Sequence, residues 1–143
     1  MPYKFIEDVA IAEVAFEAVG KTLRELFESA GLALINTQIR NIQKIEKKVK
    51  QKIEVEAENI EMLLFNFLQE LIVLKDSEQL LFNKFDIDIM PKNKKWKLIA
   101  LAYGEKINPK KHDLSADVKG VSLHNFKVEE TKGGWRAFVI LDV

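Results

Sequence analysis

The chain of 143 residues is the length of one ordinary domain, and 48% of its residues are hydrophobic, which is enough to build a core. Its 22 basic and 22 acidic side chains cancel, so any attraction to nucleic acid or to a membrane surface must come from a local patch. The absence of cysteine excludes disulfides, thiolate nucleophiles and cysteine-ligated metal sites.

The N-terminal stretch MPYKFIEDVA lacks the basic-then-apolar layout of a signal peptide, and no apolar run is long enough to span a bilayer. We therefore expect one cytoplasmic domain over residues 1–143, with no membrane partner.

The first half of the chain predicts two strands, each followed by a helix. Residues 13–20 alternate as a strand does, and residues 21–35 then show helical spacing. Thr22 and Glu25 have the spacing of a capping box at the start of that helix. The basic stretch 36–51 is expected to connect to a strand over 52–57, and Asn59 is expected to cap a second, strongly apolar helix over 60–75.

The second half predicts strands alone, over 85–89, 96–104, 117–130 and 135–143, with a loop at 108–116. The order β, α, β, α and then a β-meander predicts an α+β fold, with two helices packed on a mostly antiparallel β-sheet.

The only two histidines, His112 and His124, lie twelve positions apart. Without a third ligand at matching spacing they are a weak zinc signal, and we favour a hydrogen-bonded loop histidine and strand histidine. Ser122 lies two positions before His124, so a strand would point both side chains the same way. A nucleophilic pair is nevertheless disfavoured, because no orienting acid or oxyanion loop is evident.

Two carboxylates near the ends of strands deserve comparison. Glu13 begins the first strand, and Asp142 lies among apolar residues at the end of the last. Burying Asp142 would require a partner or a metal, and such hard oxygen ligands suit Ca²⁺, Mg²⁺ or Mn²⁺. The simpler alternative is that Asp142 is exposed at a frayed chain end.

Basic stretches occur at 40–52, 92–97 and 106–111, but aromatic residues are poorly interleaved with them. A solvated lysine face is the favoured interpretation, although a tRNA-binding surface at 40–52 stays open. No glycine-rich phosphate loop is present. The hypothesis that the protein is an enzyme, such as a metal-dependent hydrolase, is therefore the least favoured.

Four segments, in order, resemble the archease family: GKTLRELFESAGLAL (20–34), LLFNFLQELIVLKDSEQLLFNKFDIDI (63–89), YGEKINPKKHDLSADVKGVSLHNFKVEE (103–130) and GWRAFVILDV (134–143). The resemblance covers nearly the whole chain. It implies an α/β sandwich and a non-catalytic partner of the tRNA-splicing RNA ligase, which joins a 2′,3′-cyclic phosphate or 3′-phosphate end to a 5′-hydroxyl with GTP and a divalent metal. Archeases promote formation of the ligase–guanylate intermediate and repeated turnover. Some are connected with a tRNA methyltransferase in a chaperone-like role.

The resemblance also implies a divalent cation, calcium or alternatively magnesium or manganese, held by acidic residues. Asp142 matches the C-terminal aspartate of the family. The N-terminal T-A-D motif is altered: Glu13 replaces the aspartate, Ile11 replaces the threonine, and one extra residue lies between Val9 and Ala12. We expect Glu13, Asp142 and the Val143 carboxylate as ligands, with Asp8 as a substitute. The residues expected to order this end or contact a partner are Asp8, His112, Lys119, Ser122 and His124.

Overall fold

The computed structural model describes residues 2–7 and 9–143. Their elements in chain order are β1 (Tyr3–Ile6), β2 (Glu13–Gly20), α1 (Leu23–Gln38), a short 3-10 helix (Ile42–Lys44), β3 (Val49–Ala57), α2 (Ile60–Glu78), β4 (Leu80–Lys92), β5 (Lys95–Lys106), β6 (Gly120–Thr131) and β7 (Gly134–Asp142).

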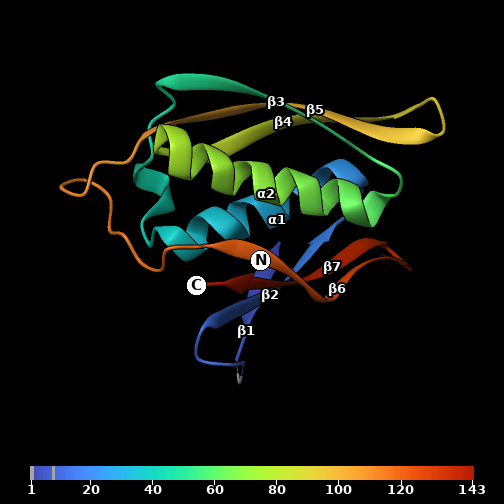
Figure 1. The fold of residues 1–143 in the computed structure, drawn as a ribbon, viewed down its shortest axis with the longest axis horizontal. Coiled ribbons are helices and arrows are strands. Elements are labelled where there is room, and N and C mark those ends of the chain that lie inside the picture. Colours follow the sequence, from blue (N-terminus) through green and yellow to red (C-terminus); the bar gives the residue numbers. More distant parts are fainter. Residues whose placement is uncertain (1, 8) are drawn as a thin grey trace.

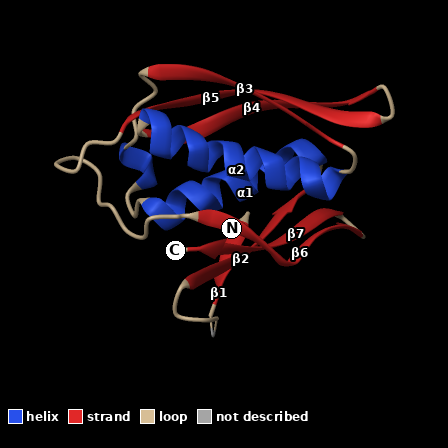
Figure 2. Ribbon diagram, in the orientation of Figure 1, coloured by secondary structure: helices blue, strands red, loops and turns tan. Residues whose placement is uncertain are grey.

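The two helices form a layer between two antiparallel sheets (Figures 1 and 2). One sheet has the strand order β1-β2-β7-β6, and the other has the order β3-β5-β4. The predicted α+β fold, with helices packed on antiparallel strands, is confirmed. The structure adds that the strands divide into two sheets, so that each helix has strands on both sides and buries most of its circumference.

Side chains cap the N-termini of both helices, as predicted. Thr22 Oγ1 accepts a hydrogen bond from the backbone N–H of Glu25 (3.1 Å), and the Glu25 carboxylate returns to the N–H of Lys21 (2.8 Å). Asn59 Oδ1 accepts from the N–H of Met62 (2.8 Å) at the start of α2. These bonds satisfy N–H groups that the first helical turn leaves free.

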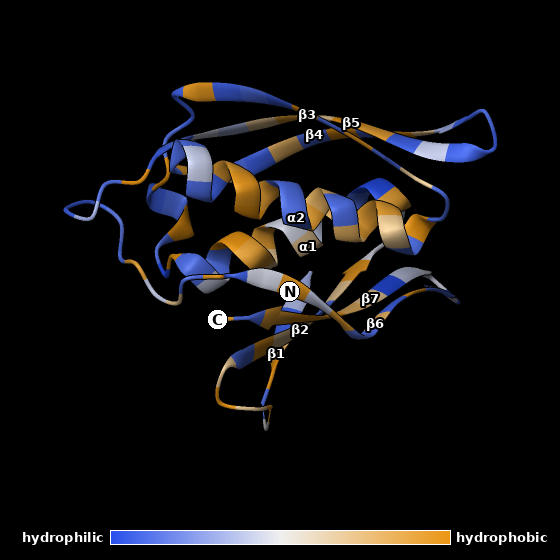
Figure 3. Ribbon diagram, viewed as in Figure 1, coloured by the Kyte–Doolittle hydropathy of each residue, from blue (hydrophilic) through white to orange (hydrophobic). Residues whose placement is uncertain are grey.

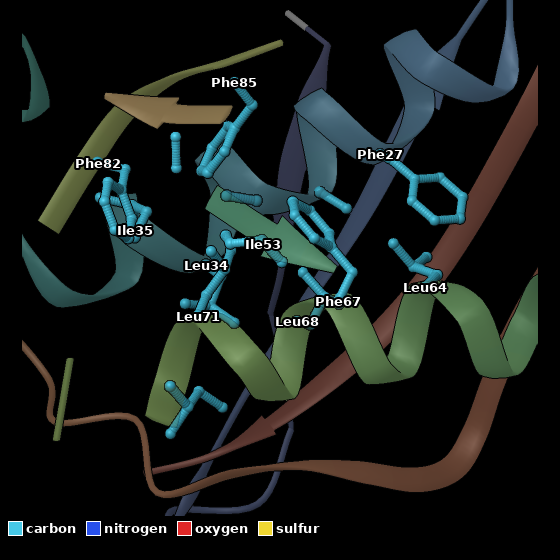
Figure 4. Packing of buried hydrophobic residues seen from close by; sticks show 14 of the residues in the cluster. Phe27, Leu34, Ile35, Ile53, Leu64, Phe67, Leu68, Leu71, Phe82 and Phe85 are labelled. Atoms are coloured by element: carbon cyan, nitrogen blue, oxygen red, sulfur yellow. The ribbon is translucent and has the colours of Figure 1, made fainter. Parts of the chain in front are cut away.

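The core lies between the layers, where hydrophobic ribbon segments of both helices face the sheets (Figure 3). Its centre is aromatic: Phe67 of α2 stacks near Phe27 of α1 (6.1 Å between ring centroids) and meets Phe85 of β4 edge-on (5.6 Å). Figure 4 shows these rings among Leu34, Leu64 and Leu68. Neither helix in the described part of the chain is long and apolar enough to cross a bilayer.

The predicted strand 117–130 was wrong in two respects. Residues 117–119 precede β6, and the β6–β7 register shifts between Ser122 and Lys127. Asn125 has a left-handed backbone (φ 57°) inside this irregularity. Strict alternation therefore fails there: Phe126 packs edge-on against Phe65 of α2, whereas His124 is exposed.

Candidate functional site

Glu13 and Asp142 face each other at one end of the four-stranded sheet. Strand β2 pairs with β7 so that Glu13 is directly opposite Asp142, although 129 positions separate them in the sequence. Opposed residues of an antiparallel pair project from the same face, with Cβ atoms about 4.5–5.5 Å apart. The β2–β7 pairing thus brings together the two carboxylates that the sequence selected.

The backbone around this acidic pair, Glu13 and Asp142, is held from both sides. The N–H of Val143 donates to the carbonyl of Ala12 (3.0 Å), and the N–H of Lys119 donates to the carbonyl of Asp142 (2.7 Å). The backbones of Val143 and Lys119, two residues of the predicted site, are therefore hydrogen-bonded beside the acidic pair. The predicted Asp8 lies outside the described residues.

Electrostatics make the acidic pair unusual. Like charges directly opposite each other across two strands repel. Among residues 2–7 and 9–143, neither Glu13 nor Asp142 lies within 4.0 Å of a cationic side chain. Glu13 is half-buried and Asp142 is exposed, so the pair can receive a ligand from solvent. Asp142 is exposed, as the simpler alternative expected. It is nevertheless paired with β2 as the last residue of β7, so it does not lie in a frayed end.

Hard oxygen donors of this kind fit a calcium-type cation. The described residues contain no group of three histidine, cysteine or acidic side chains that could hold a metal ion. A cation bound by the Glu13 and Asp142 carboxylates would therefore need further oxygen ligands, such as water or groups of a partner.

Ser122 and His124 follow Gly120, the residue of β6 that is paired with Asp142. Ser122 is opposite Ile140 and so shares the sheet face of Asp142, two residues away. Its Oγ accepts a hydrogen bond from the backbone N–H of His124 (3.1 Å), and not from the imidazole ring. This contact shapes the irregular turn of β6 and provides no nucleophilic pair.

His112 lies in a different part of the fold, bound to Glu105 of β5 in the three-stranded sheet. Its Nδ1 accepts the backbone N–H of Asn108 (2.9 Å), which leaves Nε2 to donate to Glu105 Oε2 (3.1 Å). The ring is buried, so it clamps the loop after β5 onto the strand. His112 thus lies in a loop held to the three-stranded sheet, whereas His124 lies in β6 of the four-stranded sheet. The side-chain hydrogen bonds of His112 are with Asn108 and Glu105, and none among the described residues joins it to the acidic pair.

Sequence reasoning missed the partner of His112. Glu105 is buried and also accepts from Lys111 (2.7 Å) and from the backbone N–H of Glu46 (2.7 Å). Burial acts to raise the pKa of Glu105, but these hydrogen bonds and that from His112 outweigh it and lower the pKa from 4.5 to about 2. The only signal in the sequence is a carboxylate at a strand end, seven residues before a histidine.

Comparison with known proteins identifies the family of this chain. A sequence model of the Archease protein family (MTH1598/TM1083) matches residues 3–143. The chain belongs to the archease family. The protein archease of Pyrococcus furiosus is 43% identical over 133 residues, which are 92% of this chain and 93% of that one, and the protein archease of Pyrococcus abyssi is 41% identical with the same coverage.

Solved structures of the archease family share the fold. The solution structure of Methanobacterium thermoautotrophicum protein 1598 is 32% identical, with a TM-score of 0.87 over 99% of each chain. A Thermotoga maritima archease, described as a possible chaperone, is 18% identical with a TM-score of 0.61 over 96% of this chain and 97% of that one; it supports the fold alone.

Proposed function

We propose that this protein is a non-catalytic activator of the tRNA-splicing RNA ligase. It promotes formation of the ligase–guanylate intermediate and repeated turnover. The proposal rests on membership of the archease family. The single structural observation that carries it is the acidic pair, two opposed carboxylates open to solvent on one face of a sheet.

In this proposal Glu13, Asp142 and the Val143 carboxylate hold one divalent cation, calcium or alternatively magnesium or manganese. A bound cation would supply the positive charge that the opposed carboxylates lack and would offer free coordination positions to a partner. Glu13 is one methylene longer than the aspartate of the family pattern, and the same oxygen chemistry is available from it.

The partner surface in this proposal surrounds the acidic pair. Lys119 and Ser122 flank Gly120, which is paired with Asp142, and His124 lies two residues further along β6. Leu123, between Ser122 and His124, is 60% exposed. Protein-binding surfaces combine apolar contacts with a polar rim, and an exposed leucine among polar side chains fits that composition. The description of the Thermotoga maritima archease as a possible chaperone also fits a protein whose work is done on a partner.

The alternative partner is a tRNA methyltransferase, with tRNA binding or a chaperone-like role. The basic stretch 40–52 offers it little support, because carboxylates neutralise much of this stretch. Arg40 pairs with Asp113 (3.1 Å), Lys48 lies 3.8 Å from Glu105, and Lys52 pairs with Glu54 (2.7 Å). Tight tRNA binding by this protein alone, falling steeply with salt, would favour the alternative.

The proposed function is tested by RNA joining with the ligase of the same organism at a large excess of RNA ends. The native chain should raise the number of joining events per ligase, and Glu13→Ala and Asp142→Ala should abolish that rise while keeping the fold. Glu130→Ala is the matched control, because Glu130 is an exposed carboxylate of the same sheet away from the acidic pair. Undiminished stimulation by Asp142→Ala would remove the metal role.

A further inference from the structure

Strand β3 carries a charge pattern that reverses its sign at the centre. Residues 48–58 read KVKQKIEVEAE, so a lysine stands at every second position before Ile53 and a glutamate at every second position after it. All of these charged side chains are exposed, and Ile53 is buried on the opposite face of the strand. We call them the charged row: Lys48, Lys50, Lys52, Glu54, Glu56 and Glu58. One half of the charged row is therefore complementary to the other half, with Ile53 as the midpoint.

The charged row lies on an open edge. Strand β3 is outermost in the three-stranded sheet, and β5 is its one neighbour among the strands that the structure describes. The carbonyl of Lys52 accepts a hydrogen bond from an adjacent side chain (2.9 Å), and the carbonyl of Glu56 accepts one from Asn66 of α2 (3.0 Å). Both donors lie outside the β3–β5 ladder, so these carbonyls point to the open edge. Because backbone groups alternate in direction along a strand, those of Lys50 and Glu54 point outward as well.

We propose that two copies of this protein pair through β3, edge to edge and antiparallel, about a two-fold axis at Ile53. In this register position 52 lies opposite 54 of the second copy, 50 opposite 56, and 48 opposite 58. Every lysine of the charged row thus faces a glutamate, and the axis repeats each contact. Opposite charges that face each other across two strands stabilise the pairing.

The backbone geometry fits the same register. Ile53 has the opposite parity to the outward-pointing residues, so its N–H and C=O are directed to β5. The two Ile53 residues at the axis therefore form a non-hydrogen-bonded pair, which alternates with bonded pairs in an antiparallel ladder. On either side of the axis, the outward groups of Lys52 and Glu54 lie opposite each other and can exchange both N–H···O=C bonds. The side chains that now bond these edge carbonyls are exposed and can be displaced.

The charges favour this register over its neighbours. Moving the axis by one residue would place Lys52 opposite Lys52, or Glu54 opposite Glu54, where like charges repel. An edge of uniform charge would repel a second copy in every register. Within one chain the charged row makes exposed ion pairs, such as Lys52 with Glu54 (2.7 Å), which contribute little to stability and can rearrange. The reversal of sign at Ile53 therefore points to a second copy of this chain in one alignment.

Helix α2 places an exposed apolar side chain at the same level. It runs back along β3 in the opposite direction (Figure 1), and the hydrogen bond between Asn66 and Glu56 fixes their relative position. The strand covers about 10 Å from Glu56 to Ile53. The helix also covers about 10 Å from Asn66 to Val73, in close to two turns, so both side chains lie on the same side of α2. Val73, which is 51% exposed, therefore lies level with Ile53 and would approach its own copy across the axis.

The pairing leaves the acidic pair open. Glu13 and Asp142 belong to the four-stranded sheet, on the other side of the helix layer from β3 (Figure 1). The proposed function does not use β3. A dimer joined through β3 would present two acidic pairs to its partners at once.

The test is sedimentation of the full chain at concentrations from about 1 μM to about 1 mM, which spans weak and moderate self-association. The native chain should change from monomer to dimer as its concentration rises, and added salt should weaken the dimer. Glu54→Lys with Glu56→Lys makes the centre of the charged row basic, and Lys50→Glu with Lys52→Glu makes it acidic. Each double variant alone should raise the dissociation constant by about tenfold or more.

Mixing the two double variants is the sharpest arm, because every basic position of one then faces an acidic position of the other. The mixture should recover a dimer at least as tight as the native one. Asp86→Lys with Asp88→Lys is the matched control: it makes the same change of charge at exposed positions of β4, the opposite edge of the same sheet, and should dimerise as the native chain does. Val73→Asp is an independent variant and should weaken the dimer by placing two carboxylates near the axis.

Three outcomes would overturn the proposal. They are a native chain that stays monomeric over the whole range, a dimer that is undiminished in a folded double variant, and no recovery when the two double variants are mixed. A monomeric native chain would leave the β3 edge to a strand of another protein. None of these outcomes depends on ligase stimulation, so the proposed function stands or falls separately.

Discussion

Replacing Glu105 by glutamine should destabilise the protein in a way that depends on pH. The change removes the charge that accepts hydrogen bonds from Lys111, His112 and the backbone of Glu46, and it leaves these donors facing an amide. We expect the loop after β5 to lose its main attachment to the strand.

The magnitude follows from the lowered pKa. A pKa that falls from 4.5 to about 2 on folding corresponds to about 3.5 kcal/mol at neutral pH, since each pKa unit is worth about 1.4 kcal/mol. Solvent screens part of this, because Lys111 and Lys48 reach the surface. We therefore expect Glu105→Gln to lower the free energy of unfolding by about 2 kcal/mol at pH 7.

The sign with pH is fixed by the direction of the pKa. A carboxyl whose pKa is lower in the folded state stabilises the fold above its unfolded value, near 4.5, and loses that contribution as the pH falls toward about 2. Urea unfolding of the native chain and of Glu105→Gln at a series of pH values from about 7 to about 3 gives the difference in their free energies of unfolding. This difference should narrow below about pH 4.5. Glu130→Gln is the control, since Glu130 is exposed, and should change stability little at any pH. No difference in the free energy of unfolding at pH 7, or a difference that widens in acid, would refute the reasoning.

Three further predictions concern single substitutions. His112→Ala should lower the free energy of unfolding by about 2–4 kcal/mol in urea titrations, since it removes a buried ring and its hydrogen bonds, whereas exposed His124→Ala should cost under about 0.5 kcal/mol. Gly104→Ala should destabilise by about 3 kcal/mol or more, because its Cβ would lie 1.8 Å from the Leu81 carbonyl oxygen; Gly133→Ala meets nothing within 4 Å and should be tolerated, as thermal unfolding will show. Asp142→Asn should raise metal-free stability slightly, by about 0.2–1 kcal/mol, by relieving repulsion from Glu13, and should abolish the rise in melting temperature on adding calcium. Equal costs for the two histidines, equal tolerance of the two alanines, or an unchanged calcium response would each contradict the corresponding assignment.

Local sequence patterns predicted most of the helices and strands, but not which strands pair with one another. Alternation in residues 13–20, and the caps at Thr22 and Asn59, identified β2, α1 and α2 because these signals lie within one element. Strand β1 was missed, since four residues carry little periodicity. The division into two sheets was also missed, because alternation tells which face a side chain takes and not which strand lies beside it.

The candidate site shows the same limit. Their positions at strand ends and the family resemblance selected Glu13 and Asp142, but only the β2–β7 register brings them face to face. The sequence did not identify Glu105 as the partner of His112, because the two residues meet across a loop whose path depends on tertiary contacts. The end of α1 was also missed, because the predicted helix ended at residue 35 whereas α1 continues to Gln38.

The most direct test of the account is the rate at which the RNA ligase of the same organism forms its guanylate, measured at limiting divalent metal with and without this protein. The account predicts a clear rise in rate with the native chain, and no rise with folded Asp142→Ala. An active ligase whose guanylylation is the same in the presence and absence of the native chain would contradict it.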